Sequence, residues 1–120
     1  MTQPLSPKAF QKQTGVDDES MAKLSQYAEL LVKWQKKINL VGPSTMADLW
    51  RRHMLDSAQI FPLLPKSAES YVDLGSGAGF PGLVLAILGM GPYLLVDSDG
   101  RKGIFMREVI RETGANAKVY

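Results

Sequence analysis

A glycine-rich loop directly after a short apolar run limits the folds open to this chain more than any other feature. Residues 72–82 read Val-Asp-Leu-Gly-Ser-Gly-Ala-Gly-Phe-Pro-Gly. Glycine lacks a Cβ atom, so such a loop can turn sharply and let its backbone approach a ligand closely. The free N–H groups at the start of the helix expected to follow also suit a carboxylate or phosphate group. The segment therefore predicts a strand, a ligand-binding turn and a buried helix.

The segments after this loop predict a sheet of parallel strands. We expect strands at residues 71–74 and 93–96, helices at 83–88 and 102–113, and the start of a third strand at 118–120. Strands that alternate with helices pair in parallel through right-handed crossovers. Residues 66–120 are therefore predicted to form the first half of a doubly wound, Rossmann-like α/β domain.

Residues 1–65 are predicted to form an N-terminal helical cap. Ser6-Pro7 is a typical helix start and Gly15 a typical stop. A second, amphipathic helix is expected to run as far as Gly42-Pro43, because apolar residues recur at helical spacing: Met21, Leu24, Ala28, Leu31, Ile38 and Val41.

A third helix is expected after Thr45, which with Asp48 resembles a capping box. On that helix His53, Asp56 and Ser57 would share one face, since they are three and four residues apart. They are as compatible with a buried polar cluster that ties the cap to the sheet as with a role in a ligand site.

The chain ends where the third strand has barely begun, and we expect it to stop partway through the domain. Such a sheet would have an unpaired edge, and the apolar faces of residues 83–88 and 104–110 would lack part of their cover. A chain of this extent is expected to be a marginal fold and an inactive fragment.

Two interpretations of the glycine loop compete. Gly77-x-Gly79-x-x-Gly82 satisfies the dinucleotide-binding pattern, whereas Asp73-x-Gly75-x-Gly77-x-Gly79 fits the pattern of S-adenosylmethionine-dependent methyltransferases. The dinucleotide pattern needs its first glycine at the end of the strand, where Gly75 stands, and counting from there puts Phe80 in the place of its third glycine. The register favours a methyltransferase. The alternative is an NAD-type nucleotide-binding module of an oxidoreductase or regulatory protein.

Asp97 is the acidic partner expected at the end of the second strand. A carboxylate there can accept hydrogen bonds from ribose hydroxyls. Both candidate cofactors, S-adenosylmethionine and NAD, carry a ribose. Asp97 therefore indicates a ribose but does not distinguish the two cofactors. Asp97 is also compatible with a plain turn that continues through Ser98-Asp99-Gly100.

Four stretches taken together resemble one family. They are Ile38-Asn39-Leu40-Val41, Arg52-His53-x-x-Asp56-Ser57, Asp73 to Gly82, and Asp97-Ser98-x-x-Arg101-Lys102. From about residue 17 onward, the chain resembles the ribosomal RNA small subunit methyltransferase G family, once called glucose-inhibited division protein B. The resemblance implies S-adenosylmethionine-dependent methylation of N7 of a guanine in 16S ribosomal RNA.

The resemblance also implies which residues bind the cofactor. Gly75 and Phe80 would contact it, Gly77 and Gly79 would line its methionine end, and Asp97 would lie near its ribose; Asp73 opens the motif and is counted in the same set. No catalytic residue is assigned, because guanine N7 carries a lone pair and no proton, so transfer depends on alignment rather than on a general base. No metal is expected.

Composition limits the partners and the compartment. The chain has no cysteine, which excludes disulfides and thiolate metal sites, and a formal net charge of +2 permits a polyanionic partner without requiring one. Its longest apolar run, residues 83–88, is far shorter than the roughly 20 residues that cross a bilayer. We expect a cytoplasmic monomer without a membrane partner that acts on small-subunit ribosomal RNA or the ribosomal subunit.

Basic residues that either contact phosphates or are simply solvated include Lys33, Lys36, Lys37, Arg101 and Lys102.

Overall fold

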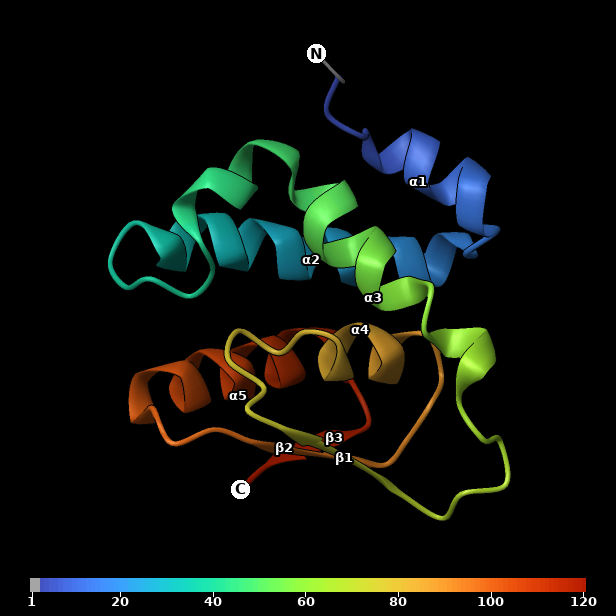
Figure 1. Cartoon of the computed structure of the whole chain (residues 1–120), viewed down its shortest axis with the longest axis vertical. Coiled ribbons are helices and arrows are strands. Elements are labelled where there is room, and N and C mark those ends of the chain that lie inside the picture. Colours follow the sequence, from blue (N-terminus) through green and yellow to red (C-terminus); the bar gives the residue numbers. More distant parts are fainter. Residues whose placement is uncertain (1–2) are drawn as a thin grey trace.

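The computed structural model describes residues 3–120 and arranges them in three layers (Figure 1). The upper layer is helical, the middle layer consists of two helices, and the lower layer is a small sheet. The main elements are α1 (Pro7–Thr14), α2 (Asp18–Gln35), β1 (Tyr71–Leu74), α4 (Gly82–Ile87), β2 (Tyr93–Val96), α5 (Gly100–Thr113) and β3 (Ala117–Val119). The predicted α/β class, a helical cap followed by the first half of a Rossmann-like domain, is confirmed.

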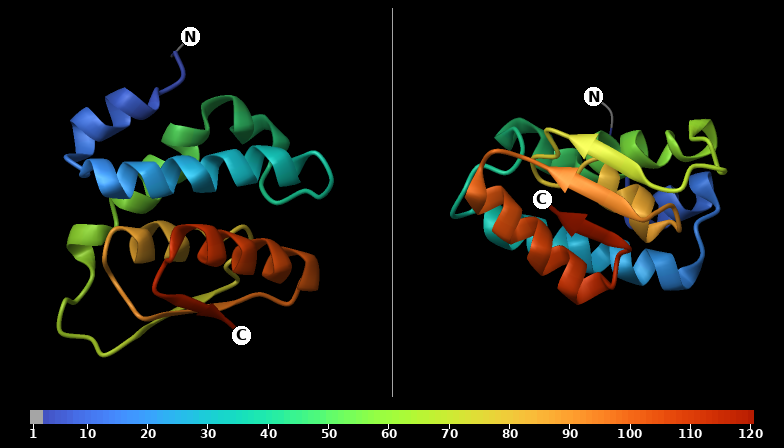
Figure 2. Two further views of the ribbon diagram at one scale, coloured as in Figure 1. Left: turned by 180° about the vertical axis from the view of Figure 1, so that it is seen from behind. Right: turned by 90° about the horizontal axis from the view of Figure 1, so that it is seen from below.

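The three strands pair in parallel in the order β1-β2-β3. Tyr93 and Leu95 of β2 are buried, on the sheet face covered by α4 and α5. The opposite face, seen from below in the right-hand view of Figure 2, carries Val72 and Leu74, which are 57% and 77% exposed. The far face of the sheet therefore carries apolar surface without cover.

The expectation that the apolar helix after the glycine loop would lack cover is wrong. All six residues of α4 are buried, because the helix lies between the sheet below and the helical layer above (Figure 1). In α5 the same expectation holds in part, because Ile104 is 56% exposed and Ile110 is half-buried, whereas Phe105, Met106 and Val109 are fully buried.

The first two helices begin where side chains cap them. The Oγ atom of Ser6 accepts a hydrogen bond from the backbone N–H of Ala9 at 3.0 Å, and Asp17 Oδ1 accepts one from Ser20 N–H at 2.8 Å. Gly15 ends α1 in the left-handed conformation, with φ +73°. Such caps satisfy backbone groups that a helix end leaves without partners, and the predicted bounds of the first helix are confirmed.

The second helix ends earlier than the sequence predicts. It stops at Gln35 rather than at residue 41, because the side chain of Gln35 holds the following loop in place. Its Oε1 atom accepts hydrogen bonds from Leu40 N–H at 3.0 Å and Val41 N–H at 3.1 Å, and its Nε2 atom donates to Val41 O at 2.9 Å. Ile38 and Val41 still pack against the core, but from a loop.

The third predicted helix is divided into short segments, and its capping box does not form. Thr45 donates its hydroxyl proton to Gly42 O at 2.6 Å, while Asp48 Oδ1 accepts from Leu5 N–H at 2.8 Å. Both side chains are therefore occupied elsewhere. The segments are η1, a 3-10 helix (Pro43–Asp48), η2, a π-helix (Trp50–Leu55), α3 (Asp56–Ala58) and η3, a 3-10 helix (Phe61–Leu63).

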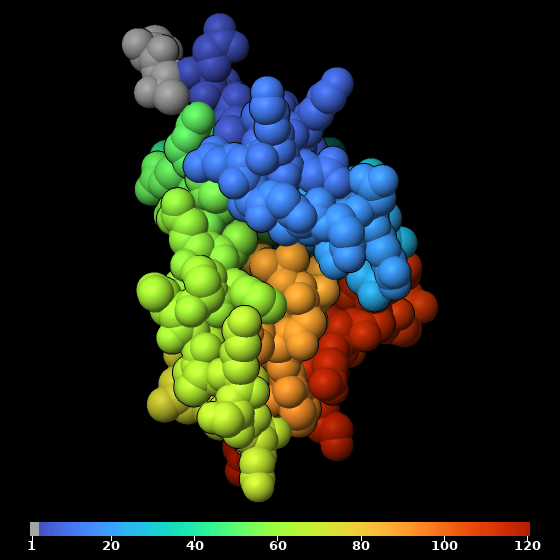
Figure 3. Space-filling model, turned by 90° about the vertical axis from the view of Figure 1, so that its right-hand side faces the viewer, coloured from blue at the N-terminus to red at the C-terminus, as the bar shows by residue number. Residues whose placement is uncertain are grey.

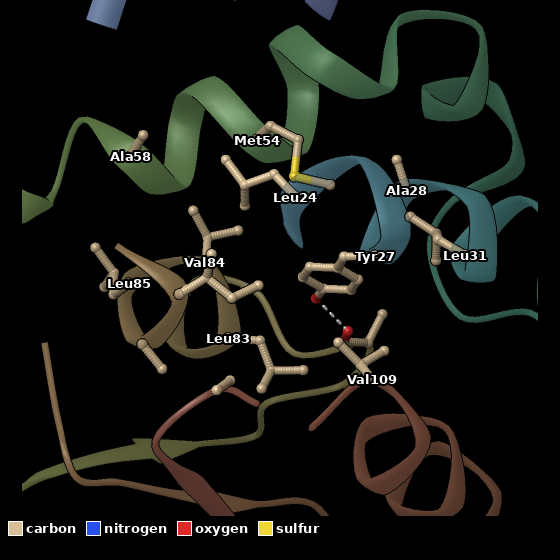
Figure 4. Packing of buried hydrophobic residues seen from close by; sticks show 14 of the residues in the cluster. Leu24, Tyr27, Ala28, Leu31, Met54, Ala58, Leu83, Val84, Leu85 and Val109 are labelled. Carbon is tan, nitrogen blue, oxygen red and sulfur yellow. Dashed lines mark hydrogen bonds between the residues drawn. The ribbon is translucent and has the colours of Figure 1, made fainter. Parts of the chain in front are cut away.

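The helical cap and the α/β part share one hydrophobic core. Leu24 and Leu31 of α2 and Met54 of η2 are fully buried in the same cluster as Val84 and Val109 (Figure 4). Figure 3 shows the outer side of this contact, where the N-terminal residues lie over the segment after α3 and over α4. The cap therefore packs directly on α4 and α5, the layer into which the glycine loop leads. Among residues 3–120, no helix is both long and apolar enough to cross a membrane.

Candidate cofactor site

The glycine loop and Asp97 lie at the carboxyl ends of neighbouring strands. Gly75 follows the last residue of β1, and Asp97 follows the last residue of β2. Leu74 and Val96, which precede them, are register partners in the sheet. Ligands of open α/β sheets bind beyond the carboxyl ends of parallel strands, so both features occupy the expected edge.

Gly75 and Gly77 leave open space above the loop. Their φ angles are +71° and +57°, in the left-handed region that favours glycine. A Cβ atom added to Gly75 would meet nothing within 4 Å, and one added to Gly77 would meet only Gly75 O, at 4.0 Å. Packing within the protein therefore does not require these two glycines. The backbone conformation requires them, and it leaves room for a ligand.

Gly79 and Gly82 are glycines for a different reason. A Cβ atom on Gly79 would lie 2.7 Å from the hydroxyl oxygen of Tyr27 and closer still to Leu83. A Cβ atom on Gly82 would lie 2.6 Å from Leu95 Cδ2 and 2.8 Å from Asp73 Oδ2. Both positions are filled by neighbouring side chains, so these two glycines serve the packing of the fold.

Asp97 connects the two loops at this edge. Its Oδ2 atom accepts a hydrogen bond from Gly77 N–H at 2.8 Å, and its Oδ1 atom accepts one from Asp99 N–H at 2.9 Å. A carboxylate oxygen has two acceptor positions, so each oxygen keeps one for a ligand hydroxyl. Asp97 is half-buried. It is a turn residue and also contacts the glycine loop directly.

Asp73 faces the helix rather than the open edge. Its Oδ2 atom accepts a hydrogen bond from Gly82 N–H at 3.0 Å. Burial raises the pKa of this carboxyl above its ordinary value, and the bond from Gly82 partly offsets that rise. The next N–H of α4, that of Leu83, donates to Gly79 O at 2.7 Å. The N–H groups of Gly82 and Leu83 are thus used within the protein, contrary to the expectation that they would be free for a ligand.

The ring of Phe80 is held between two other rings. It stacks on Tyr27 with a centroid distance of 5.0 Å and an interplanar angle of 10°, and on His53 at 4.9 Å and 27°. Both faces of the ring are therefore covered by residues of the helical cap. The backbone and the ring edge of Phe80 are the parts that remain for a ligand.

His53 lies beside a small cavity next to the loop. The hydroxyl proton of Thr45 is donated to Gly42 O, so the 2.7 Å contact between Thr45 Oγ1 and His53 Nε2 requires a proton on that nitrogen. Burial lowers the pKa of His53 below its ordinary value; nearby Arg52 lowers it further, and Asp56 partly opposes the shift. The cavity has a volume of about 240 Å³ and is lined by Arg52, His53, Asp56, Ser57, Ile60, Phe80 and Pro81.

The structure brings some of the predicted site residues to the open edge and uses others in the fold. Gly75, Gly77 and Asp97 meet at the edge, as expected. Asp73, Gly79 and the Phe80 ring instead hold the loop against the surrounding elements. His53, Asp56 and Ser57 line one cavity beside Phe80.

Two residues that shape the loop were missed by the sequence analysis. Ser76 is buried; its Oγ donates to Asp73 O at 2.7 Å and accepts from Val96 N–H at 3.2 Å, which joins β1 to β2. Tyr27 is fully buried and donates its hydroxyl proton to Ala78 O at 2.6 Å. A signal for Tyr27 was present, because it lies three residues after Leu24 on the apolar stripe of the second helix.

A basic cavity opens between the end of α2 and the start of α5. Both elements reach the same side of the molecule in Figure 1. The cavity has a volume of about 290 Å³ and is lined by Gln35, Lys36, Lys37, Ile38, Asn39 and Arg101. Arg101 Nη2 lies 3.5 Å from Asp99 Oδ2. Within residues 3–120, Lys36 and Lys37 form no ion pair. The cavity is therefore suited to an anion.

Comparison with known proteins points to one family. Residues 20–119 match the family model described as rRNA small subunit methyltransferase G. A curated relative of that name from Paramagnetospirillum magneticum is 57% identical over 109 residues, covering 91% of this chain and 53% of the relative. The protein of the same name from Rhodospirillum centenum is 57% identical over 111 residues, covering 92% and 51%.

A third relative of the same name, from Parvibaculum lavamentivorans, is 52% identical over 123 residues, covering 98% of this chain and 54% of the relative. The chain thus spans about half the length of the curated relatives it matches. The region matched by the family model contains all of α2 but its first two residues, the glycine loop and Asp97, so the candidate site falls within it, whereas α1 lies before it.

Proposed function

The chain belongs to the rRNA small subunit methyltransferase G family, and on that premise we propose that the protein binds S-adenosylmethionine over the glycine loop and methylates N7 of a guanine in 16S ribosomal RNA. The proposal rests mainly on the open backbone at Gly75 and Gly77 beside Asp97. Cytoplasmic location and a monomeric state are part of the same proposal.

The residues at the open edge fit a nucleoside that carries an amino acid. Gly75 and Gly77 leave backbone exposed to a ligand without any side chain above it. Asp97 retains acceptor positions for two ribose hydroxyls next to that backbone. Gly75, Gly77 and the backbone of Phe80 would hold the cofactor on the loop side, and Asp97 would hold its ribose.

Methyl transfer to guanine N7 requires little of the protein beyond alignment of the methyl donor with the base. S-adenosylmethionine supplies a methyl group bound to a positively charged sulfur. Guanine N7 has a lone pair and loses no proton, so no general base is needed and rate depends on positioning and on the exclusion of water. The contribution of this chain is therefore to fix the loop and to orient the ribose through Asp97.

The basic cavity supports an RNA substrate. Lys36, Lys37 and Arg101 surround space at the side of the molecule where the loop after α2 and the start of α5 meet. Contacts to phosphates position a nucleic acid without reading its sequence, and strong binding requires several of them. We propose that the RNA backbone passes over this cavity while the target base is presented to the glycine loop.

The NAD-type alternative finds no support in the comparisons, because the family model and the relatives named above are all described as methyltransferases. The structure agrees with the register argument, since Gly75 is the residue that directly follows β1. The third glycine of a dinucleotide pattern, counted from there, would stand at Phe80.

Isothermal titration tests the cofactor. We expect the chain to bind S-adenosylmethionine and not NAD⁺, and we expect Gly75→Val to abolish the binding because a branched side chain would occupy the ligand space. Gly114→Val is a matched control, since Gly114 also has φ +71° and open space around its Cβ position, but it ends α5. Equal loss of binding in both variants, or tighter binding of NAD⁺, would contradict the assignment.

Methyl transfer is tested with S-adenosylmethionine labelled on its methyl group and small ribosomal subunits. The protein at the full length of its relatives is compared with the 120-residue chain, and the labelled nucleotide is mapped by chain cleavage at N7-methylguanine. We expect label at one guanine with the longer protein. Label on an exocyclic amine, or the absence of label from every guanine N7, would overturn the proposed substrate.

A further inference from the structure

A tyrosine of the helical cap reaches into the glycine loop. Tyr27 lies in the middle of α2 and is fully buried. Its hydroxyl donates a 2.6 Å hydrogen bond to the backbone carbonyl of Ala78, the residue between Gly77 and Gly79 (Figure 4). The two partners are 51 residues apart in the chain, so the bond joins the helical cap to the loop rather than stabilising either one internally.

The same tyrosine contacts the two residues that follow Ala78. Its hydroxyl oxygen lies 2.7 Å from the position that a Cβ atom of Gly79 would take, too close for that atom to fit. Its ring covers one face of Phe80, whose other face is covered by His53. Three consecutive loop residues, Ala78 to Phe80, are therefore held by one side chain that belongs to another layer of the molecule.

The buried hydroxyl of Tyr27 needs a hydrogen-bond acceptor within the protein. Burial raises the pKa of Tyr27 well above its ordinary value, with a smaller contribution from the charge of Asp73, so the hydroxyl keeps its proton and remains a donor. A buried donor without an acceptor is costly, and Ala78 O supplies that acceptor. The loop backbone is therefore confined to the position at which the carbonyl of Ala78 meets the hydroxyl.

We infer that Tyr27 is a positioning residue for the cofactor loop: its hydroxyl and ring fix Ala78–Phe80, and this in turn presents the open backbone of Gly75 and Gly77. The inference rests on the proposed function, because it concerns the binding of S-adenosylmethionine to that loop. It assigns to the helical cap a part in cofactor affinity, exerted from a residue that does not face the open edge.

The chain offers a matched control for this tyrosine. Tyr71 of β1 also donates its hydroxyl to a backbone carbonyl, that of Pro65, at 2.5 Å, and also stacks on an aromatic ring, that of Tyr93, at 5.1 Å. Tyr71→Phe removes a hydroxyl-to-carbonyl bond, here an exposed one, from a loop that is not part of the site. Tyr27→Phe removes it from the glycine loop while keeping the ring.

Two measurements on the wild-type chain and both variants test the inference. In isothermal titration with S-adenosylmethionine, Tyr27→Phe is expected to weaken binding by roughly three- to tenfold, the equivalent of one hydrogen bond, and Tyr71→Phe to leave it unchanged. In hydrogen exchange, the amides of Ser76, Gly77 and Gly79, all hydrogen-bonded in the loop, are expected to exchange faster in Tyr27→Phe relative to those of α5, and not in Tyr71→Phe.

The outcomes separate the inference from the function on which it rests. If the wild-type chain does not bind S-adenosylmethionine, the proposed cofactor assignment fails for this chain, and hydrogen exchange alone decides whether Tyr27 fixes the loop. If binding occurs and Tyr27→Phe binds as tightly as wild type, or its affinity falls no further than that of Tyr71→Phe, the inference is overturned. Loop amides that exchange no faster than those of α5 in Tyr27→Phe would overturn it as well.

Discussion

Gly77 and Asp97 are joined by a 2.8 Å hydrogen bond from the Gly77 N–H to Asp97 Oδ2, although they follow different strands and are 20 residues apart in the chain. The bond connects the loop after β1 to the loop after β2. A ligand that contacts either loop is therefore affected by the position of the other.

We expect Asp97→Ala to weaken S-adenosylmethionine binding by roughly 1.5–3 kcal/mol, the range for hydrogen bonds to a charged group. The variant loses the acceptors proposed for the ribose and also releases Gly77 N–H. Asp99→Ala is the control, because the Asp99 carboxylate caps α5, with Oδ1 accepting from Arg101 N–H at 2.9 Å, and accepts no bond from the glycine loop in residues 3–120. If Asp97→Ala bound normally and lost only thermal stability, Asp97 would be a turn residue alone.

The two classes of glycine should differ in urea denaturation. Gly79→Ala is expected to lower the free energy of unfolding by about 1–3 kcal/mol more than Gly75→Ala, the range for overpacking a filled site. Both variants carry the strain of a positive φ, but only the Cβ at Gly79 would collide with Leu83 and Tyr27. Equal losses would contradict the packing role of Gly79.

His53 should titrate below its ordinary pKa of about 6.5, chiefly because it is partly buried. It is the only histidine in the sequence, so its ring protons can be followed by NMR without overlap. The unfolded chain binds a proton more readily than the folded chain between the two pKa values. The free energy of unfolding is therefore at its full value above about pH 6.5 and falls as pH is lowered through the folded-state pKa of His53.

His53→Gln provides the comparison, because it lacks the titrating group and should lose that part of the pH dependence. Thermal or urea unfolding between pH 7 and pH 5 measures the slope. A folded-state pKa of His53 at or above 6.5 would contradict the effect of burial.

The basic cavity should contribute to the salt dependence of RNA binding. Replacing Lys36, Lys37 and Arg101 by Gln is expected to reduce the slope of log K against log salt by about 0.7 for each phosphate of single-stranded RNA that these side chains neutralise. A mixed-sequence single-stranded oligoribonucleotide serves as the probe. The control replaces three other exposed lysines, Lys8, Lys12 and Lys66. The same slope in both triple variants would leave the cavity without a part in RNA binding.

The loop and its register were predictable because they depend on local rules. Gly75 and Gly77 follow a short apolar strand. The alternation of strands and helices implies that the strands pair in parallel. Asp97 was found in the same way, from its place at the end of the second strand. These features follow from short-range patterns that one sequence displays directly.

The contacts between layers were not predictable in the same way. The roles of Tyr27 and Gly79 depend on the placement of α2 over the loop, which is set by packing between residues 51 or more positions apart. The helix ends at Gln35 because its side chain binds Leu40 and Val41 backbone groups, and hydrophobic spacing carries no information about such bonds. Asp48 likewise accepts a hydrogen bond from the backbone N–H of Leu5, a distant residue, instead of forming its expected cap.

The division of the loop glycines into two classes predicts two kinds of defective variant in a living cell. Changes at Gly75 or Gly77 add the strain of a positive φ but displace no neighbouring atom of the protein, so the altered protein should accumulate to larger amounts than variants at Gly79 while the proposed RNA target stays unmodified. Changes at Gly79 or Gly82 disturb packing and should lower the abundance of the protein itself through proteolysis of unfolded chains. Measuring protein amount beside target modification would therefore distinguish the two classes of variant.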